Sequence, residues 1–167
     1  PALLIAAMKG KDPAFRDMAA QLVAEFPSDD LVPRFIEGLD KLPPEGQVAM
    51  LRGLAGRADK TAGPAVAGLL AASNPAVKLA AVKALASLGG GKDVAEIAGL
   101  LVSDDAELSK AAYATLVALK GDDVNPAIAS AWTNGPAARR ALLLDILTDR
   151  RADQTLSLAS QGLSESE

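Results

Sequence analysis

Apolar and polar residues alternate along the chain with the spacing of an amphipathic helix. The segment from Asn74 to Leu85 is the clearest case, because Ala81, Val82 and Leu85 fall on one helical face. The Asn74 side chain can accept hydrogen bonds from free backbone N–H groups, and Pro75 fits the first helical turn. The pattern predicts a helix that begins directly after Asn74.

The same pattern returns every 31 residues. Counting back from Pro75 reaches Pro44 and then Pro13, and each opens a segment of the same shape. Counting forward, Leu85 aligns with Leu116, and the register continues to the last repeat, so that five copies share it. We call positions 31 residues apart a column, and the helices of this series first helices.

A second apolar pattern follows each first helix. Its buried column is predicted to contain Leu39, Leu70, Leu101, Trp132 and Leu163, and projecting it backwards reaches Met8. Short turns separate the halves, so consecutive helices become antiparallel neighbours, and one helix pair cannot bury its apolar face alone. The sequence therefore predicts an all-α fold, a right-handed α-solenoid of antiparallel helix pairs with one shared core.

We predict a single repeat domain over residues 1–167. The predicted units are a half repeat at 1–11 and repeats 1 to 5 at 12–42, 43–73, 74–104, 105–135 and 136–167. In the half repeat, Leu3, Leu4, Ile5 and Met8 lack a companion first helix, and the chain starts with neither Met nor a signal peptide. We therefore expect a fragment of a larger protein, with more repeats before residue 1 or with self-association through this half repeat.

Composition narrows the possible functions. Half of the residues are hydrophobic but only 3% are aromatic, which suits closely packed helices. The absence of Cys and His removes thiolate nucleophiles, imidazole bases and the usual zinc ligands. A net charge of −4 gives no positive field for nucleic acid or an anionic membrane, and no apolar run is long enough to span a bilayer. We expect no cofactor, no metal, no nucleic acid and no membrane partner.

The clearest first helix resembles that of HEAT-like repeats, in the short bacterial form related to phycobilisome-lyase repeats. The matching motif is Asn74-Pro75 followed by Val77-Lys78-x-x-Ala81-Val82-x-Ala84-Leu85. The resemblance covers nearly the whole chain and implies a curved stack whose second helices line an inner surface that holds another macromolecule. It is nearly silent about chemistry, because such stacks serve as scaffolds, lyase subunits and DNA-repair enzymes.

Repeat 2 departs most from this pattern. Its first helix contains Gly46, Gly53 and Gly56, and each glycine costs up to about 1 kcal/mol relative to Ala in a helix interior. We expect this helix to be the weakest.

Two aromatic residues allow a functional and a structural interpretation. Trp132 is the sole Trp and could mark a binding site, but its column otherwise contains leucines, which favours a role in the core. Tyr113 shares a column with Val82, which also favours the core, and its hydroxyl then needs a partner or a route to solvent.

Four charged pairs raise the same question. They are Arg139-Arg140, Arg150-Arg151, Asp104-Asp105 and Asp122-Asp123. The arginines could form a basic patch for a phosphate or an acidic partner, but Arg140 lies in an ordinary polar column, which favours a solvated face. The aspartates could serve acid/base or Ca²⁺ chemistry, but both pairs lie at predicted helix starts, where capping is favoured.

We predict a non-catalytic protein–protein interaction scaffold or spacer module of a larger bacterial protein. The candidate protein-binding inner surface consists of second-helix positions outside the apolar columns: Arg34, Glu37, Lys41, Glu96, Ser130 and Gln161. Few Trp, Tyr or Arg residues are available there as anchors, which indicates weak binding, or binding by a neighbouring part of the parent protein. The alternatives are a nucleic-acid-binding or DNA-glycosylase-type enzyme and a bilin-lyase-like subunit, and both depend on the repeat architecture alone.

Overall fold

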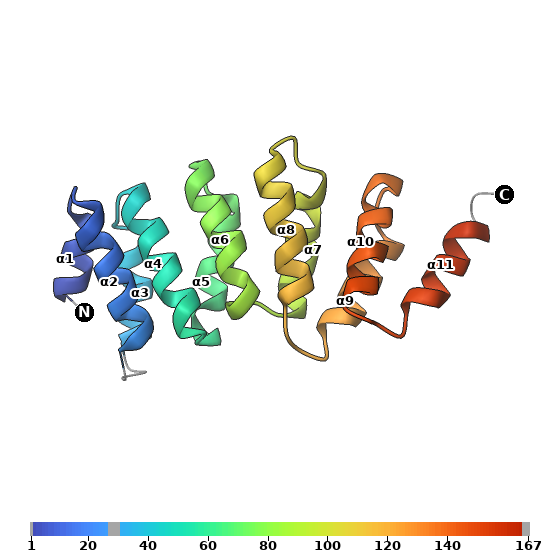
Figure 1. Cartoon of the computed structure of the whole chain (residues 1–167), viewed down its shortest axis with the longest axis horizontal. Coiled ribbons are helices and arrows are strands. Elements are labelled where there is room, and N and C mark those ends of the chain that lie inside the picture. Colours follow the sequence, from blue (N-terminus) through green and yellow to red (C-terminus); the bar gives the residue numbers. More distant parts are fainter. Residues whose placement is uncertain (1, 27–30, 165–167) are drawn as a thin grey trace. The chain divides into compact units, whose positions relative to one another are not determined.

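The structure is a computed structural model that describes residues 2–26 and 31–164 (Figure 1). Every regular element in those two ranges is an α-helix or a 3₁₀ turn, which confirms the predicted all-α helical repeat fold. The chain divides into two compact units, Pro1–Gly89 and Gly90–Glu167. The boundary between Gly89 and Gly90 lies in one of the short turns that separate the halves of a repeat, here repeat 3, and the assignment of all residues to one domain stays a prediction.

The first helices begin at intervals of 31 residues. They are α2 (Pro13–Glu25), α4 (Pro44–Arg57), α6 (Pro75–Leu88), α8 (Ala106–Ala118) and α10 (Ala137–Asp149). Asp12, Asn74 and Asp105 cap three of them by accepting hydrogen bonds from backbone N–H groups of the first turn. The predicted period and the predicted start after Asn74 are confirmed.

The second helices are shorter and less regular. They are α1 (Ala2–Lys9), α3 (Val32–Leu39), α5 (Gly63–Gly68), α7 (Val94–Gly99), α9 (Val124–Thr133) and α11 (Thr155–Ser164). Helices α5 and α7 lie between 3₁₀ turns: η2 (Lys60–Ala62) and η3 (Leu69–Ala71) flank α5, and η4 (Gly91–Asp93) and η5 (Leu100–Val102) flank α7. Across the described part of the chain, no helix is long and apolar enough to cross a membrane.

The core of the first unit lies between its first and second helices. Helix α4 packs against both α2 and α6, and α1 packs against α2. The large apolar side chains buried there are Met8, Val23, Phe35, Leu39, Met50, Leu54, Leu70 and Leu85. Met8, Leu39 and Leu70 belong to the predicted second-helix column, so the backward projection of that column to Met8 is correct.

In the second unit, α9 packs against α7 and α10, and α8 packs against α7 and α10. Leu116 and Leu147 are fully buried, and Leu101 and Trp132 are nearly so. Trp132 is therefore a core residue, as its column predicted. The last member of that column, the side chain of Leu163, lies outside the described side chains.

The glycines of α4 lie where neighbouring helices come closest. A Cβ atom on Gly53 would lie 2.8 Å from both the carbonyl oxygen of Ala20 and the Cβ of Val23 on α2. On Gly56 it would lie 2.9 Å from the Cβ of Ala24. Helix α4 is nevertheless unbroken over 14 residues. These glycines admit α2 at close range, a role that sequence reasoning missed, and the low stability expected for α4 stays a prediction.

We expect opposite effects from two Gly→Ala substitutions in the first unit. Gly53→Ala should lower the free energy of unfolding by about 1–2 kcal/mol, because the steric cost of overpacking exceeds the gain in helix propensity. Gly68→Ala should raise it by up to about 1 kcal/mol, since nothing lies within 4 Å of the added methyl and the helical backbone suits Ala. Urea unfolding of both variants checks the signs, and destabilisation by both would contradict the close-approach argument.

Candidate protein-binding surfaces

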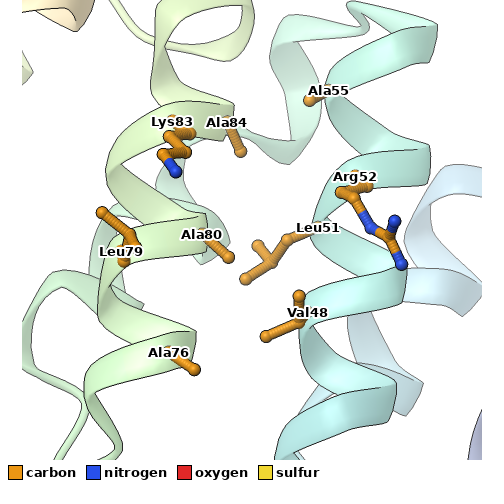
Figure 2. A pocket seen from close by; sticks show the side chains of 9 residues that line it. All are labelled: Val48, Leu51, Arg52, Ala55, Ala76, Leu79, Ala80, Lys83 and Ala84. Atoms are coloured by element: carbon orange, nitrogen blue, oxygen red, sulfur yellow. The ribbon is translucent and has the colours of Figure 1, made fainter. Parts of the chain in front are cut away.

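An apolar groove of about 380 Å³ lies between α4 and α6 in the first unit (Figure 2). We call it the α4–α6 groove. Its lining residues are Val48, Leu51, Arg52, Ala55, Ala76, Leu79, Ala80, Lys83 and Ala84. In Figure 2, Val48 and Leu51 point from α4 towards the alanines of α6. All lining residues except Arg52 and Lys83 are aliphatic, so the groove offers apolar surface with a cationic margin.

Small side chains explain why the groove is open. Ala76, Ala80 and Ala84 follow one another at four-residue spacing, which places them on one face of α6. Methyl groups are too short to fill the space beside α4. Ala84 shares a column with Gly53, the glycine that lets α4 approach α2 closely. At this position α6 therefore carries a methyl group where α4 carries only a hydrogen atom. The sequence signal for the groove was this alanine spacing.

The charges at the groove come from Arg52 and Lys83. An Nη atom of Arg52 lies 2.5 Å from a carboxylate oxygen of Asp17 on α2, and both side chains are more than half exposed. An exposed ion pair of this kind contributes little to stability, so the Arg52 guanidinium is available for exchange with another carboxylate. Helix α6 carries Lys78 and Lys83 and no acidic residue. The groove margin therefore favours a negatively charged ligand.

A second hollow of about 300 Å³ extends the groove towards the N-terminal ends of three first helices. It shares Val48, Arg52 and Ala76 with the groove, and its other walls are more polar, with Arg16 and Glu45 among them. The two hollows together form a continuous path along the first helices of the first unit.

Five residues of the candidate surface predicted from the sequence lie on second helices instead, and the sixth, Lys41, lies in the turn after α3. Arg34, Glu37 and Lys41 are exposed, and the structure brings them together around a hollow of about 340 Å³ beside α1. Glu96, Ser130 and Gln161 are exposed as well, on α7, α9 and α11 of the second unit. Binding by these six residues stays a prediction. The groove between first helices was not predicted, because the family resemblance directed attention to the second helices.

The aspartate pairs have structural roles, one of them different from the prediction. A carboxylate oxygen of Asp105 accepts hydrogen bonds from the backbone N–H groups of Glu107 and Leu108, so it caps α8 as predicted. Asp123 does not cap α9 with its side chain. It has helical backbone angles, whereas capping residues are usually extended, and its carboxylate accepts a 2.9 Å hydrogen bond from the N–H of Gly91. No group of three potential metal ligands occurs among the described residues.

Arg150 stabilises the end of α8, which corrects both earlier interpretations of this arginine. One of its Nη atoms donates to the carbonyl oxygens of Leu116, Val117 and Leu119 at 2.7–2.9 Å, and its Nε donates to the Asn125 side chain at 2.6 Å. Burial lowers its pKa from the usual value. The side chain is half-buried and satisfies carbonyls at a helix terminus, so it belongs neither to a basic patch nor to a solvated face.

Arg140 has a similar role at the end of α9. Its Nε donates to the carbonyl oxygen of Gly135 at 3.0 Å, and its guanidinium lies 5.1 Å from the centre of the Trp132 ring. This stacking holds the arginine against the core through a cation–π contact. Arg140 is therefore half-buried and anchored, in contrast to the solvated side chain that its column predicted.

Tyr113 is half-buried, which corrects the core position that its column favoured. The hydroxyl does have the partner that it needs, because it donates a 2.7 Å hydrogen bond to a carboxylate oxygen of Asp149 on α10. This hydrogen bond, with smaller effects from burial and from the charges of Asp149 and Asp145, raises the pKa of Tyr113 to about 12. The pair links two consecutive first helices at their surface.

The sole tyrosine allows a direct test of this link. Ultraviolet absorbance titration should give a pKa near 12 for Tyr113, and Asp149→Asn should move it towards 10, because the charged acceptor is lost. The folded pKa is raised, so the stabilisation is complete below pH 10 and disappears as the pH rises from 10 to 12. A pKa near 10 in the unmodified chain would contradict the hydrogen bond.

Comparisons with known proteins agree with this architecture. The family model of HEAT repeats matches residues 32–117. No curated protein matches the chain significantly. Among solved structures, the crystal structure of an engineered protein, a target of the Northeast Structural Genomics Consortium, is similar with a TM-score of 0.59 and 20% identity, over 95% of this chain and 83% of that chain. At that identity the likeness concerns the fold alone.

Proposed function

Since the chain belongs to the HEAT-repeat family, whose members generally mediate protein–protein interaction, we propose that it is a non-catalytic interaction scaffold or spacer. The observation that carries the proposal is the α4–α6 groove, which offers apolar surface for a partner's side chains between two rigid helices. The helical solenoid fold of this family is typically non-catalytic. No observation on the described residues favours the DNA-glycosylase or bilin-lyase alternative.

The occupant that fits the groove is an acidic amphipathic helix of a partner protein. Its apolar face would contact Val48, Leu79 and the alanines of α6, as helices do in apolar grooves generally, above the buried Leu51. Its carboxylates would meet the Arg52 and Lys83 side chains at the margin. No described acidic residue lines the α4–α6 groove itself, and a carboxylate of such a helix would compete with Asp17 for Arg52.

The affinity expected for such a helix is modest. The lining contains no aromatic residue, and Arg52 is the only member of the residue types that usually dominate binding energy. A groove of about 380 Å³ accepts a few aliphatic side chains. We expect dissociation constants on the order of 10–100 μM for a single helix, with weaker binding at higher salt.

Two synthetic peptides test the proposal with probes of known composition. One is a fluorescent amphipathic helix with leucines on one face and glutamates flanking them, and the other has lysines in place of the glutamates. Fluorescence anisotropy should detect binding of the acidic peptide only. Ala80→Glu should weaken it at least about tenfold, because a carboxylate then stands on the apolar wall of the groove and repels the peptide.

Two further variants control this experiment. Ala114→Glu changes an exposed alanine in the middle of α8, outside the groove, and should leave the affinity unchanged. Arg34→Glu combined with Lys41→Glu reverses the charges on the second-helix surface. Binding that resists Ala80→Glu but is lost in that double variant would refute the groove and transfer the proposal to the second-helix surface.

A further inference from the structure

Helix α2 and its C-cap residue Phe26 carry an apolar stripe that remains partly exposed. Phe15, Met18, Leu22 and Phe26 are 58%, 56%, 43% and 43% exposed, and their spacing of three and four residues places them on one face. We call these residues the α2 stripe. Leu3 on the neighbouring helix α1 is 86% exposed. In soluble proteins a stripe of this kind normally lies against another element, and large exposed apolar patches mark interaction sites.

The stripe occupies the columns through which the next first helix packs. Met18 shares a column with Ala49, and Leu22 shares a column with Gly53. On α4 both positions are buried, and Gly53 lies against Ala20 of the preceding first helix. The α2 stripe therefore continues an interface already present between α2 and α4, with large side chains in place of small ones. The geometry of the α2 stripe therefore favours another helix packed alongside α2.

We propose that a second copy of this chain covers the stripe, with the two α2 helices antiparallel. The stripe is self-complementary in that arrangement, because Phe15 of one copy stands opposite Phe26 of the other, and Met18 stands opposite Leu22. A two-fold pair needs this self-complementarity, since the same patch serves both partners. An antiparallel pair closes after two copies, as isologous contacts do. The proposal refines the predicted self-association through residues 1–11: Met8 is buried, Leu4 and Ile5 are half-buried, and most of the exposed apolar surface lies on α2.

The area available is enough for a weak pair. Large apolar side chains bury about 200 Å² each when fully covered, so the exposed fractions of the stripe leave on the order of 400 Å² per copy. Two copies would bury about 800 Å² of apolar surface, the size of a weak and transient interface. The pair should therefore form at high micromolar concentrations and dissociate on dilution.

Sedimentation equilibrium of the whole chain tests the proposal. The average mass should rise from 17.0 kDa towards twice that value over a concentration series up to roughly 0.5 mM. Met18→Glu should hold the mass at that of the monomer. Val102→Glu is the matched control, because Val102 is 48% exposed on η5 in the second unit, and it should pair like the unmodified chain. Circular dichroism verifies that both variants keep their helix content.

A mixing experiment tests the antiparallel register. Met18→Glu and Leu22→Lys should each be monomeric, because a charge then faces an apolar side chain. Mixed together they should pair, since Glu at position 18 of one copy meets Lys at position 22 of the other. This rescue is expected only if the two positions stand opposite each other.

Three outcomes would overturn the proposal: an unmodified chain that stays monomeric throughout, pairing that survives Met18→Glu, and a mixture that remains monomeric. The first outcome would assign the stripe to a helix outside this sequence, in a preceding repeat or in another polypeptide. The proposal is independent of the α4–α6 groove, and Ala80→Glu should leave the mass of the pair unchanged.

Discussion

The packing of each first helix against its predecessor is the constraint on which the first unit depends. Because the register is 31 residues, α4 and α6 present the same columns to their neighbours in the first unit, and Leu54 and Leu85 are both buried in the shared interior. The helix pair that contains Leu54 could not bury this side chain alone, and neither could the pair that contains Leu85. The unit is therefore stabilised by its neighbour contacts, and the side chains at those contacts also determine which surfaces remain open.

One column illustrates this dependence. It contains Leu22 on α2, Gly53 on α4 and Ala84 on α6. Glycine lets two helices meet at close range, alanine contributes to a wall that leaves a groove, and leucine on α2 remains partly exposed. Side chains that differ by a few carbon atoms in one column thus give a close helix contact at Gly53, a groove at Ala84 and an exposed association surface at Leu22. These three sites therefore differ in how the helices pack and not in any catalytic group.

Most of the fold could be predicted from the sequence, because helix starts and buried columns depend on local spacing. The start at Pro75 and the burial of Met8 and Trp132 follow from periodicity alone. The candidate site could not be predicted in the same way. The groove depends on the separation of α4 and α6, and the bonds of Arg150 and Asp123 depend on where distant backbone groups point. A one-dimensional pattern contains neither distances nor directions.

The two proposed surfaces of the first unit reinforce each other physically. A single groove without an aromatic anchor binds one helix weakly. A pair of copies presents two such grooves, so a partner with two acidic helices would bind the second one intramolecularly. Linked binding of this kind raises the overall affinity by about 10²–10⁴ when the linker spans both sites. Self-association through α2 is therefore a physical route by which a scaffold with shallow grooves can hold a partner firmly while each contact remains exchangeable.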